Sequence, residues 1–365
     1  MRVLQVVTNM DRGGLETMLM NYYRHMNREK VQFDFLVHRQ ERAAYDGEIE
    51  ALGGKIYRLP RLVPWSKSYL SALNCFFDEH PEYKVVHVHQ DCLSSVILKA
   101  TQQHNVPVRI AHSHNSSQDK NIKYLLKLLY MRSIPKYATH LFACSTAAGD
   151  WMFRGSQYRL LANAVDTEQF SFSTDQAAKV RETLGLDENC FLIGHIGRFW
   201  IQKNHSFIVD IFAKIAAHDS DARLLLVGDG GRLHEIKEKV TSLNLSDKVI
   251  FTGVRSDIPD LMRAMNFFVL PSLYEGLPVT MVEAQAAGLP CIISDKVPPE
   301  CILTEGLVDV MPLSAGAEAW ADAILEKRNI PRTDHSAEIA AHGFDITTEA
   351  VKLQEFYLNA YEQNC

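Results

Sequence analysis

Two acidic residues, Glu275 and Glu283, bracket a short segment that suits the binding of an anion at the start of a helix. Pro278 is expected at the first helical position, because its fixed φ fits a helix and its missing N–H would have no intrahelical partner there. The free N–H groups that follow, together with the helix dipole, would attract a diphosphate. Glu283 could accept hydrogen bonds from ribose hydroxyls, and Glu275, in the preceding loop, could face a sugar. The spacing predicts a site for one nucleotide sugar, with nucleotide contacts from Leu277, Pro278, Val279, Thr280 and Glu283. The alternative is that Glu283 is a solvated helix residue.

Cations and glycines end the strands predicted upstream of this segment. Arg198 follows Gly197 at the end of one strand, and Lys203 precedes the next helix. Arginine binds phosphate through a planar fork and lysine as a mobile point charge, so the two suit a leaving diphosphate. Gly228 and Arg255 follow the next two strands, where a nucleotide base could lie against the backbone. For Arg198 and Lys203 the alternative is a surface ion pair.

Another glycine pair, Gly13 and Gly14, follows the first predicted strand and opens the first predicted helix. Without a Cβ, these residues would let a phosphate or sugar approach the backbone N–H groups. The pair does not fit the G-x-G-x-x-G pattern of dinucleotide binding. The alternative is a simple chain reversal.

Four histidines end two further strands, as His87-x-His89 and His112-x-His114. Alternate residues of a strand face the same way, so the four could bind a metal, and a metal-dependent hydrolase is a competing enzyme class. The carboxylates that catalytic metal sites generally use are missing nearby, and no metal is expected. Interior hydrogen-bonded histidines are the other alternative. Asp219-x-Asp221 precedes a strand and so lies at the wrong edge of its sheet for a metal site.

Short apolar runs alternate with helical patterns along the whole chain. Strands are predicted over residues 2–8, 33–38, 55–58, 85–89, 108–112 and 140–144, and then over 191–197, 224–227, 249–252, 267–270 and 291–294. Helices are predicted over residues 15–26, 69–79, 93–104, 122–136, 205–217, 233–243, 259–264 and 278–287. This order predicts two doubly wound α/β domains with parallel sheets, whose ligands bind beyond the carboxyl ends of the strands.

Composition narrows the class of protein. A chain of 365 residues is long enough for two domains, and 47% hydrophobic with 22% charged residues is typical of globular proteins. The absence of a long apolar stretch predicts no membrane span, and residues 2–8 are too short an apolar run for a signal peptide. A cytoplasmic protein is expected, with its seven scattered cysteines reduced.

Charge is distributed unevenly along the chain. Residues 1–165 carry 21 Lys and Arg against 14 Asp and Glu, whereas the remainder carries 17 against 30. The densest basic segment, residues 120–136, places Leu125, Leu128 and Leu129 at helical spacing among Lys120, Lys123 and Lys127. This pattern favours a helix resting on an anionic membrane surface. The alternative is a core-facing helix with a solvated lysine face.

Taken together, the ordered motifs resemble those of glycosyltransferase family 4, the retaining GT-B enzymes, and more narrowly those of bacterial capsular and exopolysaccharide synthesis. The motifs are Gly13-Gly14-x-Glu16, Asn163-x-Val-Asp166, Gly197-Arg198 with Lys203, Gly228-Asp-Gly230, and Glu275-x7-Glu283 followed by Ala287-Gly288-Leu-Pro290. The resemblance implies two facing Rossmann-like domains with a cleft between them. Residues 1–165 would bind the acceptor and 166–345 the nucleotide sugar, and a helix in 346–365 would cross back to the first domain. Lys296-Val-Pro298 departs from the glycines usual before Pro299-Glu300.

The resemblance also implies an activity. A hexose or N-acetylhexosamine would pass from a nucleotide sugar, with uridine diphosphate the expected carrier, to a saccharide or a polyprenyl-diphosphate-linked oligosaccharide. Metal and nucleic acid are not expected to take part. Arg198, Lys203 and the Pro278 helix would stabilise the leaving diphosphate, which takes the acceptor proton on the same face of the sugar. His114, or less favourably His112, corresponds to the family's active-site histidine. A GT-B-like subunit that has lost catalysis and scaffolds an active partner is the alternative.

Overall fold

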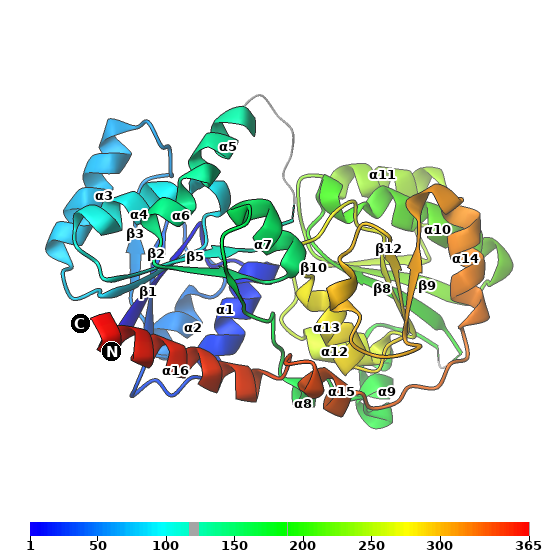
Figure 1. Ribbon diagram of the computed structural model, residues 1–365. Coiled ribbons are helices and arrows are strands. Elements are labelled where there is room, and N and C mark those ends of the chain that lie inside the picture. The colour runs from blue at the N-terminus through cyan, green and yellow to red at the C-terminus, as the bar shows by residue number, and fades with distance from the viewer. Residues whose placement is uncertain (117–123, 188, 365) are drawn as a thin grey trace. The chain divides into compact units, whose positions relative to one another are not determined.

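The computed structural model describes residues 1–116, 124–187 and 189–364 (Figure 1). These residues form two compact units. The first comprises Met1–Ala164 together with the C-terminal segment that begins at Ile346, and the second comprises Val165–Asp345. Each unit contains one parallel β-sheet with helices as the connections between its strands.

In the first unit, the described residues form a seven-stranded sheet in the order β3-β2-β1-β4-β5-β6-β7. Its strands are β1 (Arg2–Val7), β2 (Gln32–Val37), β3 (Ile56–Arg58), β4 (Val85–Val88), β5 (Val108–Ser113), β6 (His140–Ala143) and β7 (Arg159–Leu160). The central strands β2 and β4 are buried along their whole length, and β1 is buried except at Arg2, which explains their apolar runs. In the register of β1 with β4, Gln5 lies opposite His87. A polar pair therefore occupies the middle of an otherwise apolar sheet.

The helices of the first unit connect these strands or pack on the sheet. They are α1 (Gly14–His25), α2 (Asp46–Ala51), α3 (Lys67–Glu79), α4 (Ser94–Gln103) with a preceding 3-10 turn (Asp91–Leu93), α5 (Tyr124–Arg132), α6 (Ile134–Tyr137), α7 (Thr146–Phe153) and α16 (Ile346–Asn364). Helix α16 lies against α1 and buries Tyr357 beside Phe33, with the ring centroids 5.9 Å apart. The last helix of the chain is thus part of the core of the first unit.

In the second unit, the described residues form a six-stranded sheet in the order β10-β9-β8-β11-β12-β13. Its strands are β8 (Phe191–Ile196), β9 (Ala222–Val227), β10 (Val249–Gly253), β11 (Phe267–Leu270), β12 (Cys291–Ser294) and β13 (Val308–Met311). Its helices are α8 (Thr167–Phe170), α9 (Thr174–Thr183), α10 (His205–His218), α11 (Leu233–Ser242), α12 (Ile258–Ala264), α13 (Val279–Ala286), α14 (Gly316–Glu326) and α15 (Ser336–Ala341), with 3-10 turns at Ile201–Lys203, Pro299–Cys301 and Leu313–Ala315. The strand order reverses between β8 and β11, so a ligand is expected at the carboxyl ends of these two strands.

The predicted parallel α/β architecture is confirmed in both units. Each predicted strand corresponds to an observed one, whereas β7, β13 and six helices (α2, α7, α8, α9, α14 and α15) were not predicted. The helix predicted over 122–136 is interrupted at Ser133, because Pro135 lacks the N–H that a continuous helix would need. Within the described ranges, no helix combines the length and apolar composition that crossing a bilayer requires. No disulfide bond joins the six described cysteines.

Candidate active site

The helix start predicted near Pro278 is present as α13, with one correction. Pro278 was predicted as the first helical residue, but it is the N-cap, with a φ of −70° and an extended ψ of 116°. The ring fixes φ and leaves ψ free, and the carbonyl of Pro278 accepts the Met281 N–H at 3.0 Å. The N–H groups of Val279 and Thr280 have no acceptor among the described residues. The Thr280 hydroxyl is also buried without a partner there. These groups remain available to an anion.

Lys203 and Glu275 contact each other. Lys203 ends the 3-10 turn before α10, and its Nζ lies 2.6 Å from the Oε1 of Glu275, in the loop between β11 and α13. Gln202 donates to the other carboxylate oxygen at 3.1 Å. Both charged side chains are largely buried, with 17% of Lys203 and 7% of Glu275 exposed. The two residues were predicted to contact different parts of the donor, but without a ligand they form a buried ion pair that joins the loop to the turn.

Arg198 differs from Lys203 in its surroundings. It is exposed, and its guanidinium has no hydrogen-bond or ion-pair partner among the described residues. The loop that carries it is packed closely against the loop after β9, since a Cβ added to Gly228 would lie 2.2 Å from the carbonyl oxygen of Gly197. Gly228 also has a φ of 137°, which side chains rarely allow. Arg198 is thus an unpaired cation on a loop whose close approach to the loop after β9 requires glycine at position 228.

Glu283 lies on the buried side of α13, with 6% of its surface exposed. Its carboxylate has no partner among the described residues, and burial raises its pKa to about 7. The structure therefore rules out the alternative that Glu283 is a solvated helix residue. An unpartnered buried carboxyl group of this kind is available to accept hydrogen bonds from a ligand.

Arg255 forms a surface ion pair, which was the alternative considered for Arg198 and Lys203. Its guanidinium bonds both carboxylate oxygens of Asp257, at 2.8 and 2.5 Å, on a partly exposed loop after β10. Its predicted contact with the nucleotide therefore stays a prediction. Asp219, the first acid of the Asp219-x-Asp221 motif, caps the end of α10 before β9 and pairs with Arg328. This placement confirms that the motif lies at the opposite edge of the sheet from the loops just described.

In the first unit, Gly13 and Gly14 occupy the start of α1 as predicted. Gly13 is the N-cap, and the N–H groups of Gly14 and Leu15 have no acceptor within the described ranges. Gly14 is exposed. The backbone at this helix start is therefore accessible, although nothing in the described structure identifies a ligand for it.

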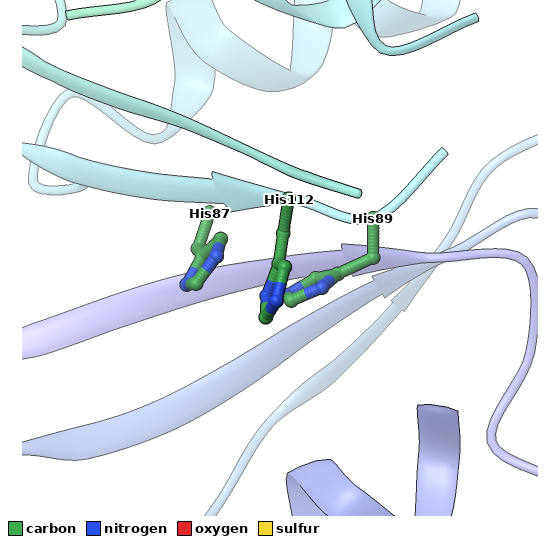
Figure 2. Close-up of side chains that lie close together, drawn as sticks. All are labelled: His87, His89 and His112. Atoms are coloured by element: carbon green, nitrogen blue, oxygen red, sulfur yellow. The ribbon is translucent and has the colours of Figure 1, made fainter. Parts of the chain in front are cut away.

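The four histidines form one cluster at the carboxyl ends of β4 and β5. The rings of His87, His89 and His112 project from neighbouring strands to the same side of the sheet (Figure 2). The His114 ring lies 4.0 Å from that of His112 by centroid, and its Nε2 lies 2.8 Å from Nδ1 of His89. Strand alternation therefore predicted the grouping correctly.

All four histidines are held neutral by their surroundings. Burial lowers the pKa of His114 to about 3 and places the pKa of the other three well below the usual value, with neighbouring histidines adding to the effect. His87, His89 and His112 have nitrogens within 4.8 Å of one another, which is close enough to hold a metal ion. However, both nitrogens of His89 already form hydrogen bonds, to His114 and to Gln5.

Two residues of this cluster were missed at the level of sequence. Gln5 of β1 lies 2.9 Å from His89, and Tyr357 of α16 lies 2.7 Å from His87 and 3.2 Å from Gln5. A polar residue in the middle of the apolar run 2–8 was the available signal for Gln5. No local pattern distinguishes Tyr357 from other aromatic residues on the buried side of a helix.

An apolar groove of about 400 Å³ lies beside α5. It is lined by Arg61, Leu62, Val63, Pro64, Trp65, Leu93, Leu126, Lys127 and Tyr130, which include two cations and no acid. Trp65 is 59% exposed, and Leu125 and Leu129 of α5 are 74% and 60% exposed. Lys120 and Lys123, which belong to the same predicted basic segment, lie outside the described residues.

Comparisons with known proteins agree with this architecture. A family model described as "Glycosyltransferase Family 4" matches residues 12–169, and one described as "Glycosyl transferases group 1" matches residues 190–327. The putative glycosyltransferase EpsF of Bacillus subtilis (strain 168) is 39% identical over 332 residues, which cover 88% of this chain and 86% of EpsF.

Two further relatives extend the comparison. The UDP-Gal:alpha-D-GlcNAc-diphosphoundecaprenol alpha-1,3-galactosyltransferase of Escherichia coli is 26% identical over 294 residues, or 76% of each chain. The crystal structure of Anabaena Alr3699/HepE in complex with UDP and glucose matches with a TM-score of 0.82 at 19% identity, covering 98% of this chain and 100% of the other. At that identity the match concerns the fold, which is GT-B as the resemblance implied.

Proposed function

Because the chain belongs to glycosyltransferase family 4, we propose that it moves a hexose or N-acetylhexosamine from a UDP-linked sugar to a saccharide or lipid-linked acceptor in cell-surface polysaccharide synthesis. The observation that carries this proposal is the group of residues at the carboxyl ends of β8 and β11. There the unpaired Arg198, the Lys203–Glu275 pair, the free N–H groups of α13 and the buried Glu283 belong to one sheet edge. Together they offer cations and amides for a diphosphate and a carboxylate for ribose.

The nature of the donor is supported by two relatives. The name of the Escherichia coli relative specifies UDP-Gal, and the Anabaena structure holds UDP and glucose. A helix N-terminus and an arginine at the same edge of the sheet also suit the diphosphate of such a donor.

In the proposed reaction, the bond between the anomeric carbon and the diphosphate oxygen breaks as the acceptor oxygen attacks from the same face. The acceptor proton passes to an oxygen of the departing diphosphate, so configuration is retained without an enzyme nucleophile. Arg198, Lys203 and the amides of Val279 and Thr280 stabilise the charge that develops on the diphosphate. His114 positions the donor sugar or the acceptor. No step requires a metal.

The test is transfer or hydrolysis of UDP-sugars by the purified chain, with and without EDTA. Turnover that survives EDTA is expected. Donor binding without any turnover, with every plausible acceptor supplied, would instead favour the scaffold alternative. Loss of turnover in EDTA that Mg²⁺ restores would contradict the metal-independent mechanism.

We also propose that the protein acts at the cytoplasmic face of the membrane, where a lipid-linked acceptor is presented. The groove beside α5 supports this, because Trp65 lines it and is exposed, and its two charged lining residues are cations. Leu125 and Leu129 of the same helix are exposed as well. Such a surface combines apolar insertion with attraction to anionic lipid. The name of the Escherichia coli relative, which specifies a diphosphoundecaprenol acceptor, points the same way.

Liposome co-sedimentation tests this surface. Replacing Trp65 and Leu129 by serine, together with Lys127→Gln, should reduce binding to vesicles that contain phosphatidylglycerol. The matched control is Leu243→Ser with Lys214→Gln on the second unit, which alters an exposed leucine and an exposed lysine of another face. Unaltered binding of the first variant would contradict membrane contact through this groove.

A further inference from the structure

Five polar side chains of the first unit form one continuous hydrogen-bonded chain. It runs from Tyr357 of α16 through Gln5 of β1 to the pair His89 and His114, with His87 bonded to the other side of the Tyr357 hydroxyl. The distances along it are 2.7, 3.2, 2.9 and 2.8 Å, starting from His87. His87, Gln5, His89 and Tyr357 are buried, whereas His114 is partly exposed. This chain of hydrogen bonds thus leads from the core to the edge of the sheet.

With the Gln5 amide oriented as it is in the structure, the direction of each hydrogen bond follows from the protons available. Tyr357 receives the amide N–H of Gln5, so its single hydroxyl proton points to Nδ1 of His87. The Gln5 carbonyl oxygen can only accept, which places a proton on Nε2 of His89. Since His89 is neutral, its Nδ1 carries a lone pair.

The same reasoning determines which ring nitrogen of His114 carries the proton. Its Nε2 faces the lone pair of His89 at 2.8 Å and must therefore donate. Nδ1 of His114 is then unprotonated, and it has no partner among the described residues. A neutral ring in this state can accept a hydrogen bond from a ligand but cannot donate one.

We propose that Gln5, His89 and Tyr357 are positioning residues that hold His114 in the Nε2–H tautomer, so that its Nδ1 accepts a hydrogen bond from a hydroxyl of the saccharide substrate. The inference rests on the proposed function for the identity of the ligand, but the tautomer is a property of the protein alone. The group recognised at His114 is a hydrogen-bond donor such as a sugar hydroxyl, because a phosphate or carboxylate offers no proton to the Nδ1 lone pair.

Two other arrangements compete with this one. If the Gln5 amide were reversed, every bond of the chain would run the other way, and His114 would carry its proton on Nδ1 and donate to the ligand. If a metal ion were bound by His87, His89 and His112, one nitrogen of His89 would ligate the ion and give up its hydrogen bond to His114 or to Gln5. Each arrangement assigns a different protonation state to the nitrogens of His89 and His114.

The experiment is long-range ¹H–¹⁵N NMR of the full chain with labelled histidine, with the His114 signals assigned by their loss in His114→Gln. The expected result is an unprotonated Nδ1 and a protonated Nε2 at His114 in the wild-type protein. Tyr357→Phe and Gln5→Met should each give a mixture of tautomers at His114. Tyr22→Phe is the matched control, because it removes another buried hydroxyl of the first unit, one bonded to the carbonyl of Ala162.

Enzyme kinetics distinguishes a loss of His114 positioning from a general loss of protein stability. Gln5→Met and Tyr357→Phe should lower kcat/KM by about tenfold, the loss expected for one misplaced hydrogen bond, while UDP binding stays unchanged. A proton on Nδ1 of wild-type His114, or a His114 tautomer unchanged in both variants, would overturn the proposal. So would stoichiometric zinc in the purified protein with coordination shifts at His89. Failure of UDP-sugar transfer alone would instead count against the proposed function, since the tautomer is read without substrate.

Discussion

The two units carry different chemistry at the carboxyl ends of their strands. The first unit presents neutral histidines whose hydrogen bonds are directed by buried partners. The second presents an unpaired arginine, an ion pair, free helix amides and a carboxyl group whose pKa is raised. Uncharged, directed groups suit sugar hydroxyls, whereas charges and amides suit a diphosphate. The two proposed tasks, hydroxyl recognition in the first unit and diphosphate binding in the second, thus correspond to different local chemistry.

Net charge alone would have assigned these tasks the other way round. Residues 1–165 are the basic part of the chain and the remainder is acidic, yet the candidate diphosphate site lies in the acidic part. Two cations of the first unit, Arg61 and Lys127, instead line the groove beside α5. A small number of placed groups decides where an anion binds, since charges beyond a Debye length are screened.

The largest expected effect concerns the ion pair of the second unit. Lys203→Met should lower the free energy of unfolding by about 3–5 kcal/mol, because Glu275 would remain buried without its cation. Lys203→Met with Glu275→Leu should recover most of that stability, yet turnover should stay at least about a hundredfold lower. Urea denaturation and initial rates measure the two effects. A stable double variant with wild-type turnover would mean that the pair is only structural.

The next effect concerns Glu283. Its charged form accepts two ribose hydroxyls best, so the KM for the donor should fall as pH rises through about 7, the raised pKa. Glu283→Gln should remove this pH dependence and raise the donor KM at high pH by about tenfold or more, as expected for a lost hydrogen bond to a charged group. Steady-state kinetics from acid to alkaline pH measures both. A variant that keeps the wild-type pH profile would reassign the ribose contact.

The raised pKa of Glu283 also makes the free energy of unfolding depend on pH in a direction that can be predicted. The folded-state pKa of about 7 exceeds the ordinary value of 4.5, so the folded state binds this proton more tightly than the unfolded state. The free energy of unfolding should therefore fall as pH rises from 4.5 towards 7, and this component should be absent in Glu283→Gln. Thermal denaturation at several pH values, comparing the two proteins, measures the difference.

The smallest effects compare two glycines of the second unit. Gly253→Ala should cost about 1 kcal/mol, because Gly253 has a φ of 67° with nothing within 4 Å of the added Cβ. Gly228→Ala should cost more, since its Cβ would collide with the backbone of Gly197 and displace the loop that carries Arg198. Equal stability and equal donor affinity in the two variants would show that this close approach has no role.

Sequence predicted the parts of the molecule that local pattern determines. Buried parallel strands are continuous apolar runs, so residues 267–270 and 291–294 were predicted with the bounds observed for β11 and β12. The two exposed residues of β7 and the largely exposed α9 have no such pattern, and they were missed. Pro278 was misplaced by one position, because a proline ring determines φ but not where the first helical bond is made.

For the site, residue types were predictable and their contacts were not. The segment from Glu275 to Glu283 predicted a helix start with an acid on either side, and the His-x-His pairs predicted a histidine cluster. The contact between Lys203 and Glu275 joins residues 72 positions apart, and that between Gln5 and Tyr357 joins residues 352 apart. Such contacts arise only when the sheets and helices pack together.

The most direct test of the diphosphate site is calorimetric titration of UDP and of uridine into the wild-type protein and Arg198→Gln. Arg198 is exposed and unpaired among the described residues, so the substitution should leave stability within about 0.5 kcal/mol of the wild type. Lys214→Gln, another exposed cation of the second unit, serves as the control. Arg198→Gln should weaken the binding of UDP by about tenfold or more and leave the binding of uridine unchanged. Wild-type affinity for UDP in Arg198→Gln would contradict this prediction.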